Sequence, residues 1–164
     1  MSELPQNTEI EAQIIGRMIR FGDRAHEIIS AMREEQFFSA RHQLIFAAVA
    51  KMAENGSPSF PSVAASMERA GTLAHVGGAA YLMDISDSVV SMVGVESDIG
   101  IVQDAYKRRQ AIELARQILN DAQEAESADD VISGAISRIA GIVNGSGSTK
   151  TGFSHAASNL DSVL

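Results

Sequence analysis

The sequence contains no cysteine and no tryptophan, and aromatic residues make up only 5% of its 164 positions. Without cysteine the chain has neither disulfide bonds nor thiolate metal ligands, which suits a reducing compartment. With so few aromatic rings, aliphatic side chains and the seven methionines must fill any core. Hydrophobic residues still amount to 45% of the chain, which is enough for a buried core.

Positive charge and long apolar runs are also lacking. Lysine and arginine number 13 against 21 acidic residues, for a formal net charge of −8. Phosphate contacts need clustered cations, so we expect little direct DNA binding by this chain. No apolar run approaches the ~20 residues of a membrane span, and residues 1–11 lack the features of a signal peptide. We therefore expect a soluble, cytoplasmic protein without membrane contacts.

Apolar periodicity predicts a series of short helices over the first 95 residues. Thr8 and Glu11 form a capping-box pattern, which predicts a helix over 9–20 with Thr8 as its N-cap. Further helices are expected over 24–33, 40–54, 61–70 and 79–85. The apolar face of the 40–54 helix is assigned to Phe38, Arg41, Leu44, Ile45, Ala48, Val49 and Met52. Gly77 and Gly78 are expected to adopt positive φ or to permit close backbone approach.

From residue 96 the pattern changes to two longer amphipathic helices. Apolar positions recur at alternating four- and three-residue steps, as in a coiled coil. Ser127, followed by two aspartates, marks the start of the second helix. The short break near Glu126 predicts an antiparallel hairpin with an exposed apolar face. The expected interface residues are Ile101, Ala105, Arg108, Ile112, Ala115, Leu119, Ile132, Ile136 and Ile139. Self-association through them is favoured over burial within one chain.

These patterns together predict an all-α protein. A compact helical bundle head, residues 1–95, precedes a long antiparallel helical hairpin, residues 96–143. The remaining residues, 144–164, begin with a Gly/Ser-rich stretch and are expected to form a flexible linker.

Few residues suggest chemistry. The four histidines have no acidic or histidine neighbour at ligand spacing, so no metal site and no catalytic residue is expected. His42 fits a half-buried, hydrogen-bonded structural histidine better than a catalytic one. The segment from Gly145 to Thr151 resembles a phosphate-binding loop, but Thr149 replaces the required glycine and a helix precedes it. A nucleotide-binding enzyme using this loop is therefore the weaker alternative to a linker.

Lys107, Arg108 and Arg109 form the one dense basic cluster. Such a cluster contacts phosphates or pairs with acidic residues of a neighbouring hairpin. The acidic chain favours the second interpretation.

An ordered set of short motifs resembles the DnaB-type replicative DNA helicases. The opening residues Pro5 to Glu11, followed by Gly16, resemble the start of their amino-terminal domain. Similar pieces follow in the family's order: Phe37-Phe38, His42, Ile45-Phe46, Gly56-x-Pro58, Gly71-x-Leu73, Val76-Gly77-Gly78, Tyr81-Leu82, Ile101-Val102 and Arg109. The resemblance spans about residues 5–143. Phe60-Pro61 departs from it, because the family usually has an aspartate there.

The resemblance implies a domain without catalytic residues that pairs through its hairpin into dimers, which can build a hexamer as a trimer of dimers. It implies primase and helicase loader as partners in DNA replication. ATP and Mg²⁺ are then expected only in the motor domain of a full-length parent, and this chain needs no cofactor. The alternative is a free-standing regulator that joins or inhibits a host helicase through the same hairpin.

Overall fold

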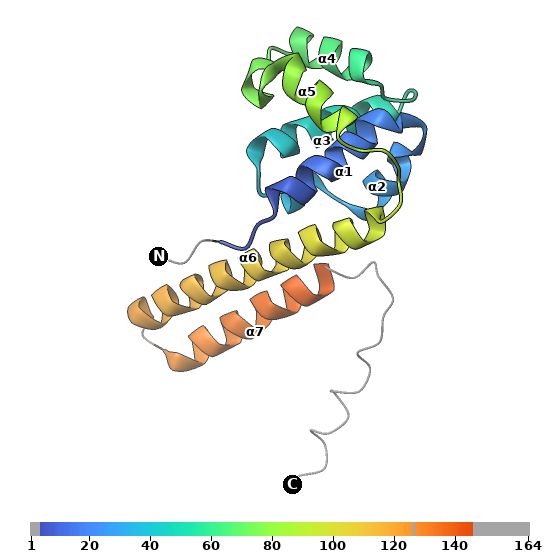
Figure 1. Cartoon of the computed structure of the whole chain (residues 1–164). Helices are drawn as coiled ribbons and strands as arrows, with labels where there is room; N and C mark the ends of the chain where they lie inside the picture. The colour runs from blue at the N-terminus through green and yellow to red at the C-terminus, as the bar shows by residue number, and fades with distance from the viewer. Residues whose placement is uncertain (1–3, 126, 146–164) are drawn as a thin grey trace. The chain divides into compact units, whose positions relative to one another are not determined.

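The computed structural model describes residues 4–125 and 127–145 (Figure 1). Within these ranges the chain forms helices and turns but no strand, which confirms the predicted all-α class. Seven α-helices are described: α1 (Thr8–Arg20), α2 (Ala25–Ala31), α3 (Ala40–Ala53), α4 (Phe60–Arg69), α5 (Gly78–Asp87), α6 (Val95–Glu124) and α7 (Ala128–Gly145). Three short 3-10 turns, η1 (Gly22–Arg24), η2 (Glu34–Gln36) and η3 (Ala74–Val76), lie between them. None of the described helices is both long and apolar enough to cross a membrane.

Internal contacts divide the chain into two units, Met1–Arg109 and Gln110–Leu164, with the boundary inside α6. The predicted end of the head at residue 95 coincides with the first residue of α6. The predicted linker, residues 144–164, lies almost wholly outside the described residues. The same is true of the segment from Gly145 to Thr151 that resembles a phosphate-binding loop.

Helix α1 is the centre of the first unit. Ile14, Ile15 and Met18 are completely buried, and α1 packs against α2, α3, α4 and α5. Gly16 permits a close backbone contact with α5. A Cβ atom at that position would lie 2.1 Å from the carbonyl oxygen of Ile85 on α5. The missing side chain therefore allows two backbones to touch.

The amino-terminal cap differs from the prediction. Asn7 is the N-cap of α1, and its side-chain oxygen accepts a hydrogen bond of 3.2 Å from the Ile10 amide. Thr8 is already helical, so the predicted capping box is wrong. Glu11 does not turn back to the cap because its carboxylate is buried and accepts backbone amides from the segment before α3.

The buried face of α3 is also rotated relative to the prediction. Its buried residues are His42, Ile45, Phe46 and Val49, whereas Arg41 and Leu44 are exposed. Phe37, not Phe38, enters the core, with its ring centre 5.2 Å from that of Phe46. Phe37 precedes the helix in extended backbone, so the helical period does not set its direction.

The ends of the remaining head helices lie close to the predicted positions. Helix α2 ends at Ala31, before the predicted Arg33, because Met32 adopts extended backbone and is buried. Gly71, Gly77 and Gly78 all have positive φ, which confirms the role predicted for the glycine pair. Helix α5 begins at Gly78 and runs two residues beyond the predicted end, to Asp87.

The first turns of α6 complete the core of the Met1–Arg109 unit. Val95, Ile99 and Val102 are buried. Polar contacts fasten the same stretch: Arg17 of α1 forms an ion pair of 2.6 Å with Asp98, and Gln103 donates to the carbonyl of Ala31 at 2.8 Å.

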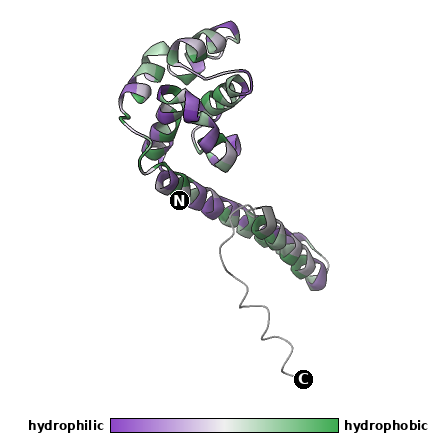
Figure 2. Ribbon diagram, turned by 90° about the vertical axis from the view of Figure 1, so that its right-hand side faces the viewer, coloured by the Kyte–Doolittle hydropathy of each residue, from purple (hydrophilic) through white to green (hydrophobic). Residues whose placement is uncertain are grey.

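In the second unit, residues 110–124 of α6 and helix α7 lie side by side and antiparallel (Figures 1 and 2). An ion pair of 2.6 Å joins Arg138 of α7 to Asp121 of α6. Figure 2 shows hydrophobic and hydrophilic stretches alternating along both helices, as expected for amphipathic rods. The predicted antiparallel hairpin is thus confirmed.

Candidate functional site

The hairpin carries a row of exposed large apolar side chains. Leu119 of α6 is 59% exposed, and Ile132, Ile136 and Ile139 of α7 are between 49% and 62% exposed. Ala115 is exposed and Ile112 half-buried. Soluble proteins rarely leave contiguous apolar rows uncovered, so this surface is the first candidate for an interface.

Helix periodicity places these residues on one face of the hairpin. Besides Ile112, the apolar residues of the second unit that are at least half-buried, which form the covered row, are Leu114 and Ile118 on α6, and Val131, Ala135 and Ile142 on α7. Around the axis of each helix, the exposed row is rotated from the covered row by roughly a quarter to a third of a turn, and the direction of this rotation is the same in both helices. Antiparallel neighbours are related by a two-fold axis normal to their common plane. Equal offsets therefore bring both exposed rows to the same side.

We call this surface the hairpin face and define it by six residues: Ile112, Ala115, Leu119, Ile132, Ile136 and Ile139. All six were predicted interface residues. Val143, which is 66% exposed, extends the row on α7, although it was not among the expected interface residues. The remaining three expected residues lie in the first unit, where Ile101 is exposed, Ala105 half-buried and Arg108 exposed. Their use as an interface remains a prediction.

The basic cluster is divided between two roles. Arg108 pairs with Asp104, one turn earlier on its own helix, at 2.8 Å. Arg109 turns into the head and donates to the carbonyl oxygens of Pro5 and Gln36 at 2.9 and 2.8 Å. Burial lowers the pKa of Arg109 from its usual value.

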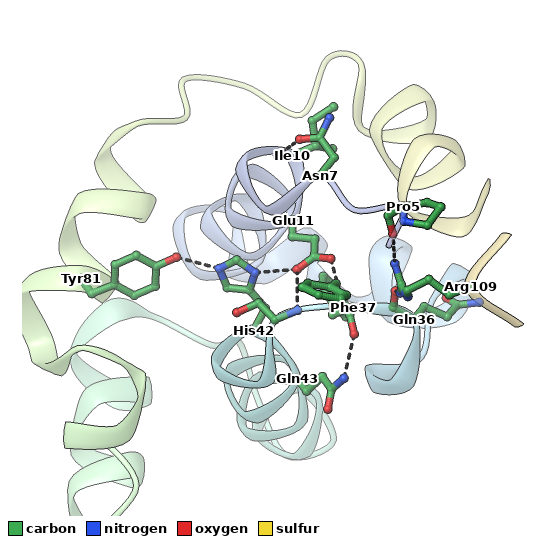
Figure 3. A network of polar contacts seen from close by, with 12 residues as sticks. Pro5, Asn7, Ile10, Glu11, Gln36, Phe37, His42, Gln43, Tyr81 and Arg109 are labelled. Atoms are coloured by element: carbon green, nitrogen blue, oxygen red, sulfur yellow. Dashed lines mark hydrogen bonds and ion pairs between the residues drawn. The ribbon is translucent and has the colours of Figure 1, made fainter. Parts of the chain in front are cut away.

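A buried polar chain links three helices of the head (Figure 3). The carboxylate of Glu11 on α1 lies 2.8 Å from Nδ1 of His42 on α3, and Nε2 of His42 lies 2.6 Å from the hydroxyl of Tyr81 on α5. Burial by itself raises the pKa of Glu11. The hydrogen bonds from His42 and from the amides of Phe38 and Ser39 outweigh burial and lower that pKa. For Tyr81, burial raises the pKa of the hydroxyl.

A carboxylate, an imidazole and a hydroxyl in this order are also the parts of a catalytic triad. Here Glu11 and His42 are each only 1% exposed, so a substrate does not reach them. The arrangement satisfies buried polar groups and holds α1, α3 and α5 together. His42 is hydrogen-bonded as predicted, but it is buried rather than half-buried. Across residues 4–125 and 127–145 no group of three or more potential ligands is placed to hold a metal ion.

A second surface lies at the loop between α5 and α6. Phe21, Arg24 and residues 90–93 line a shallow groove of about 360 Å³. Val90 and Val93 on its edge are more than 80% exposed. Arg17 of α1 holds this loop, since its guanidinium donates to the carbonyl oxygen of Ser91 at 3.0 Å.

Comparison with known proteins finds a family model and relatives that are similar to this chain. A family model described as "DnaB-like helicase N terminal domain" matches residues 3–104. The replicative DNA helicase DnaB of Treponema pallidum is 31% identical over 133 residues, which cover 80% of this chain and 29% of the relative. The chain spans less than a third of the length of the curated relatives it matches.

Two solved structures share the fold. The N-terminal domain of DnaB helicase from Mycobacterium tuberculosis superposes with a TM-score of 0.77 at 24% identity, over 85% of this chain and 99% of that one. A structure described as a DnaB-like replicative helicase "And Its Interactions With Primase" has a TM-score of 0.68 at 23% identity, over 83% of this chain and 31% of that one.

Proposed function

Because the chain belongs to the family of DnaB-like helicase N-terminal domains, we propose that it acts as the assembly and partner-docking domain of a hexameric replicative DNA helicase. The observation that carries this proposal is the hairpin face, whose large apolar side chains are uncovered in the isolated chain. Covering them with an identical face on a second chain removes apolar surface from water on both sides at once.

The proposed assembly is a two-fold dimer formed through the hairpin face, three of which make a hexamer as a trimer of dimers. A two-fold contact suits this surface, because a single face with apolar rows on both helices is able to meet a copy of itself. The net charge of −8 supports a role in protein contacts rather than in direct DNA binding.

The proposed partners are a primase and a helicase loader in DNA replication, inside the cytoplasm. Support for the primase comes from the related helicase whose structure is described with its primase interactions. In a full-length parent, ATP and Mg²⁺ are assigned to a motor domain and not to the residues described here.

Sedimentation of the whole chain across the micromolar range tests the assembly. We expect a concentration-dependent species of at least twice the 17.4 kDa monomer mass. A folded chain that remains strictly monomeric would contradict the proposal. Addition of the primase of the same replication system is expected to produce a larger complex, and a primase that sediments independently would remove primase docking from the proposal.

A further inference from the structure

The four residues Gln36 to Ser39, which we call the strap, run from the last residue of η2 through non-helical backbone to the start of α3 and are held from three sides (Figure 3). From α1, the carboxylate of Glu11 accepts the amides of Phe38 and Ser39 at 2.6 and 3.1 Å. From α3, the side chain of Gln43 donates to the carbonyl oxygen of Phe37 at 2.7 Å. The strap therefore depends on side chains for hydrogen bonds that a helix would supply itself.

The third side is α6. Arg109 donates to the carbonyl oxygen of Gln36, and its guanidinium carbon lies 5.4 Å from the ring centre of Phe38. The same guanidinium also binds the carbonyl oxygen of Pro5, ahead of α1. One arginine at the end of the first unit thus grips two separate backbone segments, and one of them is the strap.

We propose that the strap is a coupling element, through which the contacts on α1 and α3 determine how firmly α6 is anchored at Arg109. The strap is four residues long, and its side-chain partners on α1, α3 and α6 all hold the same short stretch of backbone. A shift that breaks the bonds to Glu11 or Gln43 moves the carbonyl on which Arg109 depends. Groups that share one short segment in this way act as a unit and lose their bonds together.

The coupling concerns the folded chain by itself and holds whether or not the hairpin face self-associates. Its failure is thus distinguishable from failure of the proposed function. Glu11 also attracts Arg109 electrostatically, so a change at Glu11 alone does not separate mechanical coupling from charge. Gln43 does separate them, because it is neutral and holds only the middle of the strap.

Amide hydrogen exchange on the whole chain tests the coupling. In Gln43→Ala and in Glu11→Gln, the amides of α6 around residues 103–109 should exchange roughly tenfold faster, the effect of losing one firm hydrogen bond. In the reverse direction, Arg109→Met should accelerate exchange at the amides of Phe38 and Ser39 by a similar factor.

Val63→Ala is the matched control, because Val63 is fully buried on α4 but belongs to none of these contacts. It should raise exchange evenly across the core, Leu82 included, without a selective change at residues 103–109. Unchanged exchange on α6 in Gln43→Ala would overturn the proposal and leave only the electrostatic effect of Glu11. An even rise in every variant would also overturn it. If Glu11→Gln does not fold, Gln43→Ala and Arg109→Met decide the question.

Discussion

Glu11 and His42 are 31 positions apart in the sequence, yet their side chains share a hydrogen bond of 2.8 Å in a place where each is 1% exposed. The carboxylate also holds two backbone amides, so the start of α3 is attached to α1 through one acidic group. An ionised group with this many partners stabilises the fold only while it remains ionised.

The stability of the head should therefore fall in acid. The pKa of Glu11 is lower in the folded chain than the usual value of 4.5. Its contribution is fully present above that value and is lost as the pH falls through the folded pKa. Glu11→Gln should cost about 2 kcal/mol at pH 7 and show a weaker loss of stability below about pH 4.5. Urea unfolding of both proteins at several pH values measures this difference, and parallel pH curves would contradict it.

Charge on the hairpin face should prevent self-association without unfolding the head. Leu119→Asp, and likewise Ile112→Asp, would place a carboxylate against an apolar partner, weakening association by roughly 3 kcal/mol, or about a hundredfold. Asn120→Asp adds the same charge at an exposed position that is turned by about 100° from Leu119 around α6, off the hairpin face, and should leave the mass unchanged. Sedimentation gives the mass, and circular dichroism checks the fold. Equal masses for Leu119→Asp and Asn120→Asp would show that this face is not the interface.

Gly16 should not tolerate a methyl group. In Gly16→Ala the new Cβ would overlap the carbonyl oxygen of Ile85, so α1 and α5 must separate at a cost of about 3 kcal/mol or more. Gly100→Ala is the matched change, since Gly100 lies inside α6 with nothing within 4 Å of an added Cβ. It should stabilise the helix by about 0.5–1 kcal/mol. Thermal unfolding should shift in opposite directions for the two variants, and equal shifts would contradict the close approach.

Two arginines of α1 should differ greatly in importance. Arg17 is almost buried and binds Asp98 and the carbonyl of Ser91, so Arg17→Met should cost about 3–5 kcal/mol by leaving a shielded carboxylate without its partner. Arg20 pairs with Asp87 at the surface, and Arg20→Met should cost at most about 1 kcal/mol. Chemical denaturation of the two variants compares them directly. Similar losses would mean that the burial of Arg17 carries no extra weight.

The local sequence pattern was enough to predict where the helices lie but not which of their faces are buried. The 40–54 helix was predicted within one residue of its observed end, because its apolar periodicity and the turn after it are properties of consecutive residues. Its buried face was misassigned, because His42 enters the core only when Glu11 and Tyr81 are there to bond it. Glu11 was interpreted as a capping residue for the same reason: its true partners lie beyond residue 37. The motifs of the family resemblance contained all three residues, although spacing alone did not connect them.

The sequence by itself determined that this protein is helical, that its last described helices form a hairpin with an apolar face, and that Gly77 and Gly78 adopt positive φ. These follow from steric preferences and from a repeat of three to four residues, which act within a few turns of chain. Only the tertiary structure decided that Glu11, His42 and Tyr81 meet, and that Arg109 binds the backbone carbonyls of Pro5 and Gln36. Buried polar groups must find partners wherever packing brings them, and no local rule states which distant residue that will be.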